Sequence, residues 1–198
     1  KNMKKPNIAV IREVGASGGY WIASATEYIY ANRMSITGSI GVIGSGFGVE
    51  GLMNDYNITY RRQAAGKYKD AGTPFRAPTD EENALLQHVL DSIHDEFIIE
   101  VAQNRNMSVD KVREIATGFI YLGTDAQNLG LIDEIGNLED ARLRLESQLD
   151  KNVTLAKYKE DPSLMGVLFG ATKDGFYSVG RGIGDSFKVQ DGPKFELR

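Results

Sequence analysis

Apolar and polar positions along the chain form short blocks that predict strands and helices in alternation. The apolar run at residues 7–14 follows a proline and is typical of a largely buried strand, and residues 27–31 repeat this pattern. Between them, a glycine-rich turn at residues 15–19 leads into a helix-compatible stretch at residues 20–25. Further strands are expected at residues 58–63, 131–135 and 153–159.

The clearest helix signal starts at Thr79, which forms a capping-box pattern with Glu82. The apolar residues that follow at helical spacing are Leu85, Leu86, Val89, Leu90, Ile93, Phe97 and Val101. They predict one apolar stripe along a helix of about six turns. Ser108, Thr124 and Asn137 are candidate caps of three shorter helices, which we expect to end near residues 116, 130 and 149.

Strands that alternate with helices indicate an α/β fold. The length of 198 residues is enough for one well-buried core, and we expect one folded domain over residues 1–160. From Pro162 onward the sequence becomes glycine-rich and loses its periodicity. Residues 161–198 are therefore interpreted as a carboxy-terminal tail.

The composition narrows the function mainly by exclusion. The chain has 23 Lys and Arg against 27 Asp and Glu, a formal net charge of −4, which gives no reason to expect nucleic acid as a partner. It contains no cysteine, so a thiol nucleophile, a disulfide framework and a cysteine-ligated metal are excluded. No apolar run reaches the roughly 18 residues needed to span a bilayer.

Ser17 is the first candidate for chemistry, because it stands between a predicted strand and a predicted helix. There its hydroxyl would lie at the positive end of the helix dipole. The N–H of Gly18 would be free to bind an oxyanion, and Gly18 and Gly19 would let a carbonyl come close. This logic is that of a nucleophile elbow, although the sequence is ASGG and not GxSxG. The alternative is that Ser17 only caps the helix.

A nucleophilic serine needs a base, and the chain offers few. His88 and His94 are its two histidines, and both fall on the long predicted helix, six residues apart and so on different faces. A Ser-His-Asp triad is therefore disfavoured. Lys67 and Lys69 lie in the long polar loop over residues 64–78, where burial or a positive neighbour can lower the pKa of an amine. Spacing does not separate the two, and both can equally be solvated surface lysines.

Two other chemistries are weak in this sequence. The glycine-rich stretch at residues 44–51 is not followed by a Lys-Ser or Lys-Thr pair, so a Walker A phosphate loop is absent. The acidic pairs at residues 133–134 and 139–140 fall in a turn and at a helix start, where solvated or capping roles suffice.

Four segments together resemble signal peptide peptidase A, the protease IV family. They are ASGGYWIASA at 16–25, ITGSIGV at 36–42, GKYKD at 66–70 followed by PFR at 74–76, and GFIYLGTDAQNLGLIDEIG at 118–136. They fall in the order and at the separations of that family. The resemblance covers about residues 5–150, which is most of the chain.

The resemblance implies a role for four residues. Ser17 would be the nucleophile and Lys69 the general base, with Gly18 supplying one oxyanion N–H and Ser39 orienting the lysine amine. It also implies a ClpP/crotonase-like α/β fold with repeated β-β-α units. Because the chain starts almost at the strand before Ser17, we expect the first part of that domain, with its second oxyanion donor, to be lacking. On this view the chain alone is inactive.

The resemblance further implies a serine endopeptidase that needs no metal or organic cofactor. Its expected substrates are apolar peptides such as cleaved signal peptides. A ring- or bowl-shaped homo-oligomer is implied, in which the serine and lysine of one site can come from neighbouring copies. The full-length protein would be membrane-anchored with an extracytoplasmic catalytic domain.

Three other interpretations remain open at this point. A phage prohead-type peptidase would share the dyad but cut scaffold proteins. A crotonase-like acyl-CoA binder or hydratase would share the fold but not the dyad. A non-catalytic assembly module would use the fold to build rings and would not depend on Ser17.

Overall fold

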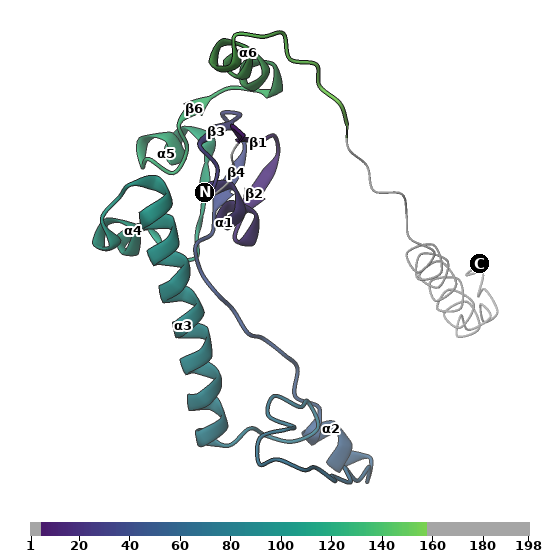
Figure 1. Ribbon diagram of the computed structural model, residues 1–198. Helices are drawn as coiled ribbons and strands as arrows, with labels where there is room; N and C mark the ends of the chain where they lie inside the picture. The colour runs from purple at the N-terminus through teal and green to yellow at the C-terminus, as the bar shows by residue number, and fades with distance from the viewer. Residues whose placement is uncertain (1–4, 158–198) are drawn as a thin grey trace, which may run out of the picture. The chain divides into compact units, whose positions relative to one another are not determined.

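The computed structural model describes residues 5–157 of the chain (Figure 1). The first compact unit is Lys1–Val153, and it contains every helix and strand described below. The predicted tail at residues 161–198 lies outside the described residues. The observed order of elements is mixed α/β, as the alternating pattern predicts.

The six strands described form two small sheets. The first sheet is parallel, in the order β1 (Ile8–Ile11), β3 (Tyr28–Ala31), β6 (Glu134–Ile135). The second has the order β2 (Val14–Ala16), β4 (Ile36–Gly38), β5 (Ile120–Leu122), with β2 parallel and β5 antiparallel to β4. Among the described residues, no strand pairs with the second edge of β1 or of β2.

The predicted single strand at residues 7–14 is wrong in its extent, because the chain changes sheets at Arg12 and Glu13. The neighbouring segment changes sheets in the same way, between β3 and β4. Ser35, which lies in that connection, joins it to the one between β1 and β2. Its buried hydroxyl donates to the carbonyl of Ile11 (2.7 Å) and accepts from the N–H of Asn32 (2.9 Å). One apolar run thus supplies a strand to each sheet.

The helices are α1 (Gly18–Ser24), α2 (Glu50–Asp55), α3 (Asp80–Arg105), α4 (Val109–Ile115), α5 (Gly123–Asn128) and α6 (Leu138–Leu149). The predicted capping box of Thr79 and Glu82 is confirmed, and so are the caps at Ser108 and Asn137. The cap at Thr124 is wrong. The N-cap is Leu122 and the helix starts at Gly123, two residues earlier than predicted, because Gly123 is buried against the backbone of Asn32, leaving no room for a Cβ.

Three predicted strands differ from the structure. Residues 58–63 form no strand, because alternation alone does not supply a neighbouring strand to pair with. The strand at residues 131–135 is reduced to β6, since the N–H groups of Leu131 and Ile132 turn back to the carbonyl of Ala126. Residues 153–157 have no regular structure, and residues 158–159 lie outside the described part.

The core lies around the carboxy-terminal half of α3. Phe97, Ile98 and Val101 are buried there, and the ring of Phe97 stacks on Trp21 of α1 with centroids 4.3 Å apart. The predicted stripe is buried only in this half. Four of its five earlier members are 41–53% exposed, namely Leu85, Leu86, Val89 and Ile93, and the fifth, Leu90, is half-buried. Within residues 5–157, no helix has the length and apolar character required to cross a bilayer.

Candidate active site

Ser17 occupies the junction between β2 and α1 in an unusual backbone conformation (Figure 1). Its φ is 54° and its ψ is −126°, a region that residues with a side chain rarely adopt. Its N–H donates to the carbonyl of Gly38 on the neighbouring strand at 2.8 Å, and its carbonyl accepts from the N–H of Trp21 at 2.9 Å. The sheet on one side and the helix on the other therefore hold the sharp turn.

A serine at the start of a helix usually caps it, but the hydroxyl of Ser17 does not. It makes no capping hydrogen bond to α1, and the residue is exposed. The adjoining Gly18 and Gly19 are also exposed, and a Cβ added to either would meet no atom within 4 Å. Neither glycine has a positive φ. Packing within the described chain therefore does not require glycine here, and the surface next to the hydroxyl is open.

Two adjoining pockets of about 290 and 400 Å³ contain Ser17. Their shared walls are Gly41, Val42 and Ile43, and the first pocket also contains Gly18, Trp21 and Phe97. The second also contains Ser39, Thr117, Gly118 and Phe119. The walls are largely apolar, and Ile43 is 85% and Phe119 70% exposed. The surroundings of Ser17 thus suit an apolar chain better than a charged ligand.

Ser39 lies in the same pocket as Ser17 and is fixed by a neighbouring turn. Its φ is 50°, its N–H donates to the carbonyl of Phe119 (2.9 Å), and its hydroxyl donates to the carbonyl of Gly118 (3.2 Å). Gly41 and Gly118 approach so closely that a Cβ on Gly41 would lie 2.7 Å from the Cα of Gly118. This turn pair forms the floor of the pocket. Gly118 and Phe119 received no individual role from the sequence, although the glycine before Phe119 marks a turn.

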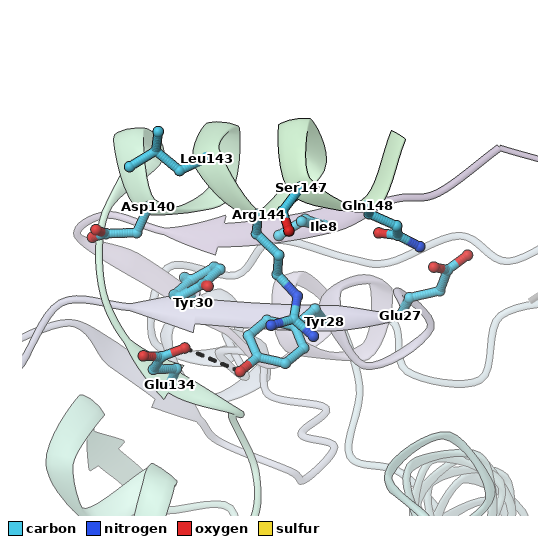
Figure 2. A pocket seen from close by; sticks show the side chains of 10 residues that line it. All are labelled: Ile8, Glu27, Tyr28, Tyr30, Glu134, Asp140, Leu143, Arg144, Ser147 and Gln148. Atoms are coloured by element: carbon cyan, nitrogen blue, oxygen red, sulfur yellow. Dashed lines mark hydrogen bonds between the residues drawn. The ribbon is translucent and has the colours of Figure 1, made fainter. Parts of the chain in front are cut away.

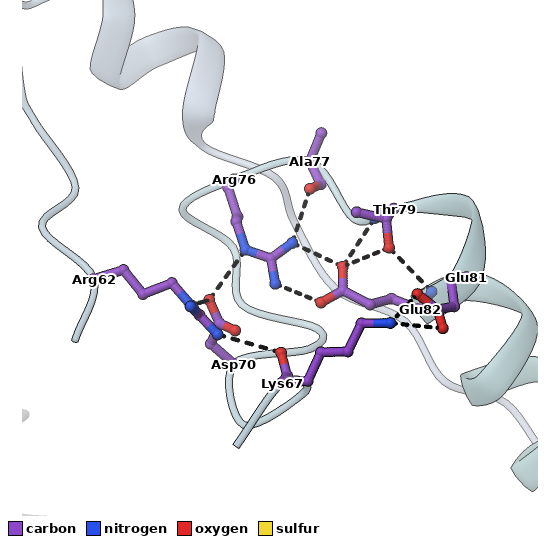
Figure 3. Close-up of polar contacts among 8 residues, drawn as sticks. All are labelled: Arg62, Lys67, Asp70, Arg76, Ala77, Thr79, Glu81 and Glu82. Atoms are coloured by element: carbon purple, nitrogen blue, oxygen red, sulfur yellow. Dashed lines mark hydrogen bonds and ion pairs between the residues drawn. The ribbon is translucent and has the colours of Figure 1, made fainter. Parts of the chain in front are cut away.

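The two candidate lysines have different surroundings, and Figure 3 shows those of Lys67. The amine of Lys67 lies 2.7 Å from one carboxylate oxygen of Glu81, and that hydrogen bond, with a contribution from Tyr68, raises the pKa of the Lys67 amine. An amine held as a cation is a poor general base. Lys69 is exposed, and its amine makes no hydrogen bond or ion pair among the described residues. The structure therefore separates two lysines that spacing could not.

The structure brings Ser17, Gly18 and Ser39 together, but among the described residues of one chain Lys69 lines neither Ser17 pocket. The loop of Lys69 contacts the start of α3 through Arg76 and Glu82, whereas Phe97 on the same helix lines the Ser17 site. Those two positions on α3 are about 22 Å apart along a helix that rises about 1.5 Å per residue. In Figure 1 the loop segment and α2 accordingly lie at the amino-terminal end of α3.

The two histidines lie outside the Ser17 pockets, and His88 is exposed. His94 contacts the carbonyl of Ala116 at 3.0 Å and so joins α3 to α4.

A larger pocket of about 600 Å³ lies between the first sheet and α6 and contains none of the predicted site residues (Figure 2). In it the guanidinium of Arg144 covers the ring of Tyr28, whose hydroxyl donates to Glu134. Residues 5–157 contain no cluster of three side chains suited to a metal ion.

Comparison with known proteins supplies the family. The model of peptidase family S49 matches residues 1–153. A protein of Methanocaldococcus jannaschii, provisionally named a protease, is 38% identical over 183 residues, which cover 92% of this chain and 58% of that protein. One from Enterococcus faecium, provisionally named signal peptide peptidase SppA, is 38% identical over 163 residues, covering 81% and 47%. The chloroplastic serine protease SPPA of Arabidopsis thaliana is 32% identical over 196 residues, covering 95% and 29%.

The chain spans 58% and 47% of the lengths of the first two of these relatives. The family match nevertheless extends over both segments discussed above, the turn of Ser17 and the loop of Lys69. It also includes all six helices and both sheets. This chain belongs to peptidase family S49.

Proposed function

We propose that this chain forms the catalytic part of a serine endopeptidase, with Ser17 as nucleophile and Lys69 as general base. The observation that carries the proposal is the turn of Ser17. An exposed hydroxyl that caps nothing is held at a strand–helix junction in a costly backbone conformation, beside two glycines with open space in front of them. Strain of this kind persists where the surrounding structure imposes it, often at active sites.

The proposed chemistry is acyl transfer through a covalent intermediate. The neutral amine of Lys69 takes the proton of the Ser17 hydroxyl as Oγ attacks the substrate carbonyl. The resulting oxyanion accepts a hydrogen bond from the N–H of Gly18, which belongs to the first turn of α1 where amides have no intrahelical acceptor. The Lys69 ammonium then protonates the departing amine, and water hydrolyses the acyl-enzyme. The mechanism uses no metal or organic cofactor.

Ser39 is suited to orient the lysine. Because its hydroxyl donates to the carbonyl of Gly118, its oxygen is left to accept a hydrogen bond from an amine. It shares the pocket with Ser17, so an amine bound to Ser39 would lie within reach of the nucleophile. Two hydroxyls on two turns would thus fix the position of one lysine amine.

We infer that the Lys69 of each site comes from a neighbouring copy of the chain in a ring- or bowl-shaped assembly. Two observations support this arrangement. The uninterrupted helix α3 separates the loop of Lys69 from the Ser17 pocket in one copy. The exposed half of the α3 stripe, Leu85 to Ile93, together with Ile43 and Phe47, leaves apolar area that a second copy would cover.

The proposed substrates are apolar peptides, such as signal peptides left at a membrane, bound in extended form. The apolar walls at Val42, Ile43 and Phe119 favour small or apolar side chains. The unpaired edge of β2 ends at Ser17, and an extended peptide can add to such an edge through backbone hydrogen bonds. The proposal places the full-length protein at the membrane, with its catalytic domain extracytoplasmic. A fold of the ClpP/crotonase type belongs to the same proposal.

Covalent labelling with a fluorophosphonate probe, measured by intact mass, tests the dyad in the full-length natural protein. Wild type should gain one label, while Ser17→Ala and Lys69→Ala should gain none. The matched control is Lys67→Ala, which should be labelled like wild type because its amine is bound to Glu81. Labelling that persists in Ser17→Ala, or an unlabelled wild type, would refute the proposal and favour a binding or scaffold role.

A mixing experiment tests whether the dyad forms between copies. Ser17→Ala chains keep Lys69, and Lys69→Ala chains keep Ser17, so neither is active alone. If each site combines two copies, a co-assembled equal mixture should recover about a quarter of the wild-type rate, because about half of the sites carry Ser17 and about half of those face Lys69. A mixture that stays inactive beside an active wild type would place both residues in one copy.

A further inference from the structure

A network of charged side chains anchors the loop of Lys69 to the start of α3 (Figure 3). The guanidinium of Arg76 lies at its centre. Its two terminal nitrogens donate to the two carboxylate oxygens of Glu82, at 2.5 and 2.8 Å. Its Nε donates to Asp70 at 3.1 Å. The same oxygen of Asp70 also accepts from Nε of Arg62 at 2.6 Å. Arg76 thus bridges two acidic side chains that belong to different segments.

Each end of this bridge is fixed to backbone. Glu82 is 4% exposed and accepts from the N–H of Thr79 at 2.9 Å, so it is also part of the capping box at the start of α3. At the other end, Asp70 directly follows Lys69 in a tight turn. In that turn the N–H of Lys69 donates to the carbonyl of Gly66 (3.3 Å), and the carbonyl of Asp70 accepts from the N–H of Thr73 (3.0 Å). A displacement of Asp70 would therefore move the backbone that carries Lys69.

We propose that Arg76 is a positioning residue that sets the location of the Lys69 amine by joining Asp70 to the cap of α3. This inference rests on the proposed function, in which Lys69 is the base. Arg76 itself touches no reacting atom. A guanidinium presents several donors in a rigid plane and can hold both carboxylates at once, whereas the compact ammonium of a lysine lacks the planar pair of donors that binds both oxygens of Glu82.

The charge of the network fits a positioning role. The two guanidinium groups lower the pKa of Asp70 far below its usual value, with Arg76 the larger cause, so Asp70 stays ionised at neutral pH. Its second oxygen, Oδ1, is buried and has no hydrogen-bond partner within residues 5–157, so the contacts of Asp70 depend on the oxygen that Arg62 and Arg76 share. Loss of Arg76 would leave that carboxylate with one partner and free Glu82 from the loop.

The neighbouring Arg61 provides a matched control. It is exposed, lies beside Arg62, and makes no hydrogen bond or ion pair among the described residues. Arg61→Gln removes the same charge as Arg76→Gln but breaks no hydrogen bond or ion pair among the described residues. A difference between the two variants therefore reports the bridge and not the net charge.

The test uses the mixture of full-length Ser17→Ala and Lys69→Ala chains, with a fluorogenic apolar peptide as substrate. Arg76→Gln is added either to the Ser17→Ala chain, which donates Lys69, or to the Lys69→Ala chain, which donates Ser17. In the chain that donates Lys69, Arg76→Gln should lower kcat by about 10–100-fold with KM within about twofold, as expected for a displaced catalytic group. In the chain that donates Ser17, it should change kcat by less than about twofold. Arg76→Lys should fall between Gln and wild type, and Arg61→Gln should have no effect.

The same data distinguish positioning from folding. A misfolded Arg76→Gln chain could not donate Ser17 either, so retained activity in that arrangement shows that the variant folds. If Arg76→Gln lowers kcat equally in both chains, or in neither, the inference is overturned. The proposed function still stands in that case, because the mixture without Arg76→Gln recovers activity. If the dyad forms within one copy, Arg76→Gln in the otherwise wild-type chain carries the test, with the same expected loss in kcat. An inactive wild type would refute both proposals.

Discussion

Replacing Phe97 by alanine removes the main contact between α3 and the helix that follows Ser17. Phe97 is 1% exposed, and its ring lies 4.3 Å from that of Trp21, with 5° between the planes. Truncating a buried phenylalanine costs about 3–5 kcal/mol, and a stacked pair contributes roughly 1 kcal/mol beyond its buried area. We expect the free energy of unfolding to fall by about 4 kcal/mol, a large part of the roughly 5–15 kcal/mol typical of a domain.

Urea unfolding followed by far-UV circular dichroism measures this loss, with Ile93→Ala as the matched control. Ile93 lies about one turn earlier on the same helix but is 41% exposed, so its truncation should cost less than about 1 kcal/mol. Measurements at the lowest usable protein concentration limit any contribution from self-association. Equal costs for the two variants, or a cost below about 1.5 kcal/mol for Phe97→Ala, would contradict the assignment of the core to one half of α3.

Two further predictions concern the loop and the pocket floor. Hydrogen bonds, from Arg76 first and then from the Thr79 N–H, lower the pKa of Glu82 from 4.5 to about 2. The ionised Glu82 carboxylate therefore stabilises the folded state fully above pH 4.5, and this contribution is lost as the pH falls toward 2. The difference in the free energy of unfolding between wild type and Arg76→Gln, measured by urea titration, should narrow over that range. Gly41→Ala should cost about 1–3 kcal/mol and reduce probe labelling, because its Cβ would collide with backbone. Gly46→Ala, which meets no atom within 4 Å, should do neither.

Five of the six described helices could be predicted from the sequence because their signals are local, whereas α2 was not predicted. Thr79 and Glu82 are three residues apart, and both the reciprocal hydrogen bonds and the helix after them are present in the structure. The same holds for the caps at Ser108 and Asn137. The failure at Thr124 has a non-local cause, since the start of α5 is set by packing against Asn32.

Strands were harder to predict because a strand exists only with a partner. Residues 58–63 were predicted as a strand like residues 27–31, yet they have no strand to pair with among the described residues. The break at Arg12 and Glu13 likewise depends on where β3 and β4 lie, which periodicity does not encode. The extent of burial on α3 likewise depends on which elements pack against it. Its apolar stripe is continuous in the sequence, but only the carboxy-terminal half is buried.

The candidate site was predictable in part. The position of Ser17 at a strand–helix junction follows from local pattern, but the absence of a capping bond to α1 required coordinates. Proximity of Ser39 to Ser17 depends on the parallel pairing of β2 with β4. Spacing left Lys67 and Lys69 equivalent and the family resemblance singled out Lys69, while the structure adds that the amine of Lys67 is bound to Glu81. Which copy of the chain supplies Lys69 stays a prediction.

The left-handed backbone at Ser17 has a consequence for how this sequence can change. A residue with a side chain at φ 54° and ψ −126° costs of the order of 1–3 kcal/mol, whereas glycine adopts such a conformation with little strain. Stability and catalysis therefore favour different residues at this position. A selection for heat resistance alone would be expected to replace Ser17 by glycine, and only a selection that scores peptide hydrolysis would retain the hydroxyl.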